Sequence, residues 1–160
     1  GEVCPFVAPA GSSLVCTQGP FGGYSHAKDN AIDVNLNSYT GALEVVSPAS
    51  GTIALVDEDV TCSTNRECSI GGRVIIKGDD GLEYLFVHIN PEDSLEEQNF
   101  IEAGQLIGRW STNVAACSGC WTGKHIHAMI SPCDNTYCEY VYRFNCDIST
   151  CASGLSTCSE

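Results

Sequence analysis

The sequence has 160 residues, 43% of them hydrophobic, a composition typical of one globular domain and not of a disordered chain. Its formal net charge is -13, with 7 Lys and Arg against 20 Asp and Glu, which excludes the basic surface that nucleic acids and anionic membranes attract. No apolar run approaches the roughly 20 residues that cross a bilayer. Together with the acidic charge, this leads us to expect neither a membrane nor a nucleic acid as partner.

The predicted elements are short strands, rich in β-branched residues and separated by Gly, Pro, Asn and Asp. In chain order they are Leu43–Val46, Thr52–Val56, Arg73–Lys77, Tyr84–Ile89, Leu106–Trp110 and His125–Ile130. The run Asp79–Gly81 predicts a hairpin turn, and Pro48–Gly51 predicts the connection of another antiparallel pair. Ser94–Phe100 fits either one helical turn or a polar loop. Without sustained helical periodicity, the pattern predicts a mainly β, antiparallel protein.

Eleven cysteines are spread over the whole chain, which indicates disulfides formed in an oxidising compartment. The sequence does not begin with a charged-then-apolar leader, so we expect the mature form of a secreted, extracellular protein. Cys62 with Cys68 and Cys117 with Cys120 are the predicted local bridges. The odd count leaves at least one cysteine unpaired or paired with another chain. We expect a main domain over residues 1–132 and a short Cys-rich extension over 133–160, packed on the same domain by its bridges.

The four histidines are the strongest signal for chemistry. His125 and His127 are two residues apart in a predicted strand, so both imidazoles project from one face. His88 ends another strand, and simple alternation puts it on the face of Tyr84 and Phe86. A His in a hairpin is more often an ordinary polar residue than a ligand, so a secreted disulfide-rich domain with surface histidines stays an alternative.

His26 lies in a Gly- and Ser-rich loop, and Asp33 follows it in a short strand-like run. Two imidazoles and one carboxylate, with a fourth position open for water, form a recognised catalytic zinc site. The remaining two imidazoles would then be free to transfer protons. The sequence thus contains enough donors for one zinc centre and its acid–base groups.

In this order the motifs resemble the lysostaphin-type metallopeptidases, which include the LasA and LytM enzymes. The resemblance covers residues from about 22 to 131 and rests on His26 with Asp33, the lone His88 and the final His125-Ile126-His127. Four further stretches are similar to family segments: Pro48–Ile53, Gly72–Gly81, Ala103–Gly108 and Thr122–His127.

The resemblance implies a folded antiparallel β-sheet with a metal site in a central groove. It implies Zn2+ held by His26, Asp33 and His127, with His88 and His125 as the catalytic histidines. It also implies a metalloendopeptidase that hydrolyses peptide bonds, with glycine-containing cross-bridges of bacterial peptidoglycan or other glycine-rich peptides as substrate. We expect such a protein to act as a monomer.

Two features depart from the family pattern. Six residues, 27–32, separate His26 from Asp33, more than in most of the family, so Asp29 is a rival ligand. The Cys-rich extension has no counterpart in the general pattern. Tyr24 is a candidate oxyanion donor, with an equal alternative as an aromatic residue packed on the groove rim. A zinc-binding, non-catalytic secreted recognition module of the same fold is the alternative function.

Overall fold

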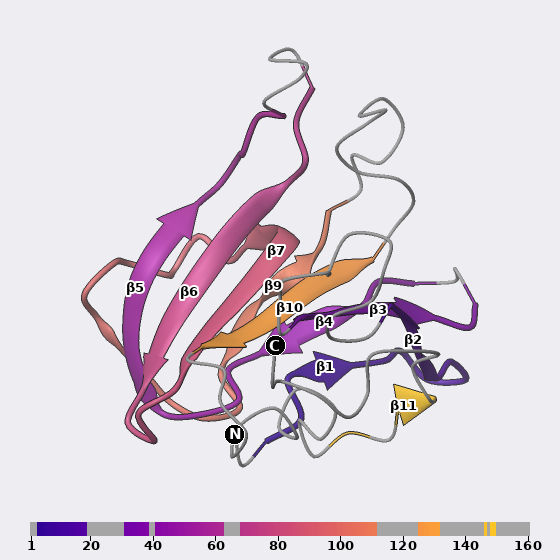
Figure 1. Ribbon diagram of the computed structural model, residues 1–160, viewed down its shortest axis with the longest axis horizontal. Coiled ribbons are helices and arrows are strands. Elements are labelled where there is room, and N and C mark those ends of the chain that lie inside the picture. The colour runs from indigo at the N-terminus through magenta and orange to yellow at the C-terminus, as the bar shows by residue number, and fades with distance from the viewer. Residues whose placement is uncertain are drawn as a thin grey trace, which may run out of the picture.

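The computed structural model describes residues 3–18, 31–38, 41–62, 68–111, 125–131, 146 and 148–149. These residues form an antiparallel β-sheet with one parallel pairing, and no helix occurs among them (Figure 1). The strands are β1 (Phe6–Val7), β2 (Leu14–Gln18), β3 (Ala31–Leu36), β4 (Glu44–Val46), β5 (Gly51–Asp57), β6 (Gly72–Gly78), β7 (Glu83–Pro91), β8 (Phe100–Ile101), β9 (Leu106–Trp110), β10 (Ile126–Ser131) and β11 (Ile148–Ser149). The predicted mainly β, antiparallel class is confirmed, and β4, β5, β6, β7, β9 and β10 coincide with the six predicted strands to within one or two residues.

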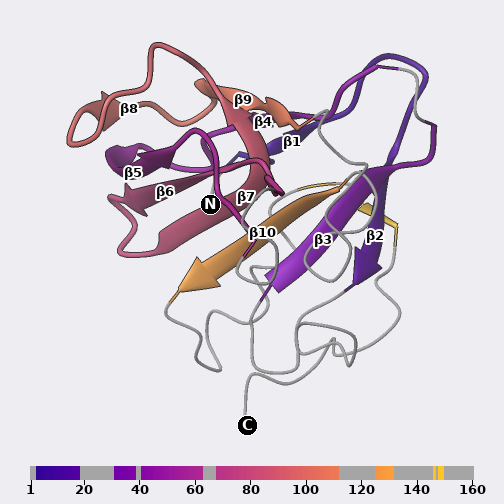
Figure 2. The same cartoon turned by 90° about the horizontal axis from the view of Figure 1, so that it is seen from above.

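Strand β7 organises the sheet because it has different neighbours along its length. Its first half lies between β6 and β10, with Val87 opposite both Arg73 and His127. From Ile89 onward β9 takes the place of β10, with Ile89 opposite Trp110. Beyond β10 the sheet continues through β3 and β2, while β9 leads to β4 and β1 (Figure 2). The sheet therefore divides beside β7, and the division falls at His88.

The hydrophobic core covers one face of the sheet. Phe86 of β7 lies opposite Ala128 of β10, which lies opposite Ile32 of β3, and all three are at most 1% exposed. Burying a Phe or Ile side chain contributes about 2 kcal/mol relative to leaving it in water. Because side chains alternate along a strand, the next row of the register, Val87, His127 and Asp33, projects from the opposite face.

The predicted turns give two different outcomes. Asp79–Gly81 joins β6 to β7 as expected, with Gly81 at φ +85° and Gly78 N–H bonded to Leu82 O at 2.8 Å. Pro48–Gly51 does not join a hairpin, because β4 pairs with β1 and β9 whereas β5 pairs with β6 and β8. The loop before β9 holds this segment instead: Ala103 N–H donates to Ser50 Oγ at 3.0 Å. For Ser94–Phe100, the second of the two predicted alternatives is observed: the segment is a polar loop that leads into β8.

The C-terminal segment is tied to the N-terminal one. Cys4 and Cys146 form a disulfide across 142 residues, and β11 pairs in parallel with β2. Cys62 and Cys68 are both disulfide-bonded, and Cys62 N–H donates to Cys68 O at 2.9 Å. Their mutual bridge and the domain division at residue 132 stay predictions, and the predicted pair 117/120 lies outside the described residues. Within the part of the chain that is described, no helix has the length and apolarity to span a membrane.

Candidate active site

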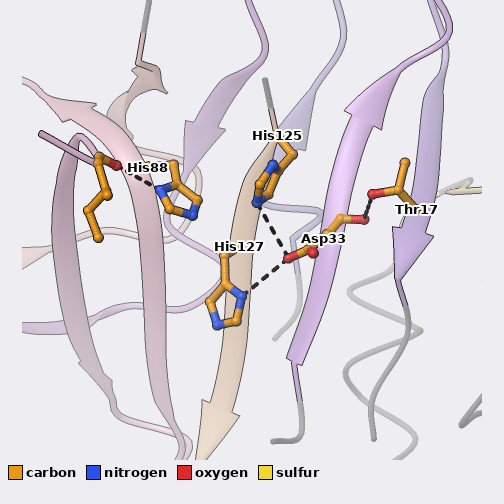
Figure 3. A network of polar contacts seen from close by, with 6 residues as sticks. Thr17, Asp33, His88, His125 and His127 are labelled. Atoms are coloured by element: carbon orange, nitrogen blue, oxygen red, sulfur yellow. Dashed lines mark hydrogen bonds and ion pairs between the residues drawn. The ribbon is translucent and has the colours of Figure 1, made fainter. Parts of the chain in front are cut away.

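Asp33 and His127 meet across the β3–β10 ladder, on the face opposite the core. They are register partners, so their side chains lie side by side (Figure 3). His127 Nδ1 donates a hydrogen bond to Asp33 Oδ1 at 3.2 Å. Asp33 is only 8% exposed, and a carboxylate that is so nearly buried requires a cationic or hydrogen-bonding partner. The pair therefore places a ring nitrogen and a carboxylate oxygen, both of which can bind a metal ion, side by side in the sheet.

His125 extends this group from the residue before β10. Its Nε2 lies 3.8 Å from the same Asp33 oxygen. Its ring lies 4.7 Å from the ring of His88, centroid to centroid, with the two planes at 75°. Asp33 thus approaches both histidines of the His-x-His pair, and His125 connects that pair to His88 (Figure 3).

A β-bulge directs His88 into the site. Arg73 lies opposite Val87, but the adjacent Gly72 lies opposite Ile89, so His88 is an extra residue in β7 with φ +68°. The alternation predicted His88 on the face of Tyr84 and Phe86, which is the core face, and that prediction is wrong. The bulge resets the alternation, so Ile89 enters the core and the His88 ring turns towards His125.

The surroundings of His88 keep its ring neutral. Its pKa is lowered from 6.5 to about 4, chiefly by burial and also by the nearby His125 and His127, whose effects outweigh the raising effects of the Ile70 carbonyl and Asp33. Nδ1 of His88 lies 2.7 Å from Ile70 O. Because a carbonyl only accepts, Nδ1 carries the hydrogen and Nε2 carries the lone pair. At pH 7 His88 is therefore a neutral imidazole whose Nε2 carries no hydrogen.

The structure brings together Asp33, His88, His125 and His127 of the predicted site residues. The other three residues of interest, His26, the rival ligand Asp29 and the candidate oxyanion donor Tyr24, lie outside the described residues. Their roles stay predictions, and so do the roles assigned to each member of the described group.

The Asp33–His127 pair can be tested for its fit to zinc. Ligand bonds of about 2.0–2.2 Å in a tetrahedron place two donor atoms roughly 3.3 Å apart. Nδ1 of His127 and Oδ1 of Asp33 are 3.2 Å apart, which matches one edge of such a tetrahedron. Among the residues described, no group of three His, Cys, Asp or Glu could hold a metal, and the predicted third ligand, His26, lies outside them. The pair fits two of the three protein ligands of a catalytic zinc site.

Comparison with known proteins decides the family. The model of peptidase family M23 matches residues 27–137, more than half of the chain and including Asp33, His88, His125 and His127. The chain belongs to peptidase family M23. This membership confirms the resemblance to lysostaphin-type enzymes and makes the protein a member of a family of peptidases.

Solved structures share the fold of this M23 domain at low sequence identity. The M23 metalloprotease pseudoalterin, from the deep sea, has a TM-score of 0.55 and 16% identity over 81% of this chain and 69% of its own. A LytM protein of Ruminococcus gnavus, provisionally assigned as a glycyl-glycine endopeptidase, has a TM-score of 0.55 and 17% identity, covering 81% of this chain and 51% of its own. The chain therefore spans about half the length of the second protein. Curated proteins show no significant sequence match.

Sequence reasoning missed one part of the site in this M23 member, the backbone of Ile70 and Gly71 beside His88. A main-chain carbonyl can belong to any residue, so its role leaves no mark on residue type. The Gly71-Gly72 pair is the signal that could have pointed to it, because adjacent glycines before a strand allow a close approach of backbones.

Proposed function

We propose that this protein is a secreted zinc metalloendopeptidase that cleaves glycine-containing cross-bridges of peptidoglycan. The carrying observation is the pairing of His127 with the buried Asp33, with His125 and the neutral His88 beside them, in a member of a peptidase family. Secretion is supported by the disulfide-bonded cysteines Cys4, Cys16, Cys62, Cys68 and Cys146.

In the proposed site His26, Asp33 and His127 hold the zinc ion. When bound, zinc would act as a Lewis acid on a water molecule and on the scissile carbonyl. As a ligand His127 would have to present a nitrogen without a hydrogen, and the nearby Asp33 Oδ1 would contribute the negative charge that favours a cation there. Burial of Asp33 strengthens that attraction because little solvent screens it.

His88 and His125 transfer protons in this proposal. The two rings are in edge contact, and His125 in turn lies 3.8 Å from Asp33 Oδ1, so both imidazoles belong to the group around the proposed metal ligands. His88 is neutral and can accept a proton, and His125, whose Nε2 lies 3.8 Å from Asp33 Oδ1, is the second histidine placed for proton transfer. Tyr24 would add a hydrogen-bond donor to the developing oxyanion.

The proposed substrate follows from the family and from the physics of an extended peptide. An extended glycine chain carries no side chains and can enter a narrow groove between β-loops. The glycyl-glycine assignment of the Ruminococcus gnavus protein supports the same substrate class for this chain. We expect the protein to work as a monomer, with the acidic surface facing solvent.

The test measures cleavage and zinc content together. Purified peptidoglycans with pentaglycine bridges and with direct cross-links are treated with the protein, with and without a chelator, and the products are identified by mass spectrometry. We expect cleavage of glycine–glycine bonds only, lost on chelation and restored by zinc. His125→Ala should keep its zinc and lose at least about 100-fold in kcat.

Matched Asp→Asn variants test the ligand. Asp33→Asn should lose zinc, whereas Asp57→Asn, at the surface pair with Arg73, should keep both zinc and activity. Loss of zinc in Asp29→Asn but not in Asp33→Asn would transfer the ligand role to Asp29. Full activity of His125→Ala would refute the catalytic assignment. A protein that binds zinc and cleaves no substrate would instead be the non-catalytic recognition module.

A further inference from the structure

His88 is held by three separate contacts, two to its main chain and one to its ring. Its carbonyl accepts a hydrogen bond from Ser111 N–H at 2.8 Å, just after β9. Its ring Nδ1–H donates to Ile70 O at 2.7 Å, just before β6. Between these two contacts lies Gly71, whose Cα region faces the His88 main chain. His88, which the bulge turns into the site, is therefore held by residues next to β6 and β9 as well as by its own strand.

Gly71 is the tightest part of this enclosure. It has φ +81°, and a Cβ built on it would lie 3.0 Å from Ser111 Cβ, 3.1 Å from His88 Cα and 3.2 Å from His88 C. The His88 atoms belong to the backbone, so they cannot move aside as a flexible side chain would. A methyl group at Gly71 must push the His88 main chain away by a few tenths of an ångström, or shift Ile70 O away from the ring.

The hydrogen bond to Ile70 also selects a tautomer. Since Ile70 O can only accept, the neutral ring keeps its hydrogen on Nδ1 and leaves Nε2 without one. In Figure 3 the second ring nitrogen of His88 points away from this bond, towards the side where His125 and His127 lie. In this state Nε2 can accept a proton, and it can donate one only after it has been protonated.

We infer that Ile70 and Gly71 are positioning residues for His88: they hold its ring at the site in the tautomer whose Nε2 is a proton acceptor. The use of that acceptor in peptide hydrolysis rests on the proposed function, whereas the placement and the tautomer do not. During hydrolysis the proton would pass from the attacking water to Nε2, while Nδ1–H stays on Ile70 O.

A pair of glycine variants separates positioning from backbone strain. Gly71 and Gly81 have nearly the same φ, +81° and +85°, but an added Cβ at Gly81 meets nothing within 4 Å. Gly71→Ala and Gly81→Ala therefore both place an alanine in the left-handed backbone region, at a similar cost in stability. Only the added methyl group at Gly71 contacts His88. We expect Gly71→Ala to lose about tenfold in kcat, with KM and zinc content unchanged, because small displacements of a reacting group are costly. Gly81→Ala should retain wild-type kcat. Equal kcat in the two variants would overturn the inference.

The tautomer is measured directly on the wild-type protein, independently of activity and of whether Gly71→Ala folds. Long-range 1H–15N NMR spectra at pH 7 report which ring nitrogen carries the hydrogen, and the His88 signals, one set among four histidines, are identified by their loss in His88→Gln. We expect hydrogen on Nδ1 of His88; hydrogen on Nε2 would overturn the inference. A wild-type protein that cleaves no peptide yet shows the Nδ1–H tautomer would refute the proposed function and leave the positioning intact.

Discussion

The stability of the folded protein should depend on pH through His88. Its pKa falls from 6.5 to about 4 on folding, chiefly because burial disfavours the charged ring. The unfolded chain therefore binds this proton more tightly, so acid favours unfolding. Above pH 6.5 both states are neutral at His88 and no stability is lost. Between pH 6.5 and about 4 the loss grows, and below that range it is complete.

The size of the effect follows from the pKa difference. Each pKa unit corresponds to about 1.4 kcal/mol, so the change from 6.5 to about 4 amounts to about 3 kcal/mol of unfolding free energy. This is a large share of the roughly 5–15 kcal/mol by which domains are stable. His88 is only 7% exposed, so solvent screens little of this cost.

Urea unfolding of the chelator-treated protein at pH values from 7 to 4 measures this loss, because metal-free protein has no metal to release as the pH falls. His88→Gln, which cannot titrate, is the matched variant. We expect its unfolding free energy to fall by about 3 kcal/mol less than that of the wild type over this range. Parallel curves for the two proteins would show that His88 is not held neutral by burial.

Two further predictions concern the framework. Replacing Cys4 with Ser should lower the free energy of unfolding by about 3 kcal/mol, because the Cys4–Cys146 disulfide closes a long loop in the unfolded chain; an unchanged urea midpoint would contradict this. Gly108→Ala should cost about 3 kcal/mol, because its Cβ would lie 2.2 Å from Asn90 O in the β7–β9 ladder, whereas Gly104→Ala, with φ +86° and nothing within 4 Å, should cost about 1 kcal/mol. Thermal unfolding of the two alanine variants side by side checks the difference.

Much of the strand pattern could be predicted from residue types. Arg73–Lys77 alternates buried and more exposed positions, Leu106–Trp110 is a short, largely apolar run, and both are strands in the structure. The turn at Asp79–Gly81 could be predicted because the turn requires a residue with positive φ, which glycine adopts readily. The two-residue strands β1, β8 and β11 were not predicted, since a pair of residues is too short to show any period.

Pairing was harder to predict than strand position. Pro48–Gly51 looks like a hairpin turn between two apolar runs, yet β4 and β5 take other partners. A turn signal states that the chain reverses and does not state which strands it then contacts. Those partners depend on how the whole sheet divides beside β7, which involves residues far apart in the chain.

The sequence by itself determined the family and the chemical types at the site: the spacing of His125 and His127 put both imidazoles on one face, and their order with Asp33 and His88 carried the resemblance. The tertiary structure decided where His88 points. Alternation alone sends it into the core with Phe86, and only the bulge against β6 turns it to His125. A bulge is a mismatch in length between two strands, and the acceptor that orients the ring is the main-chain carbonyl of Ile70. Neither is a property of a side chain, so both exist only once the strands have paired.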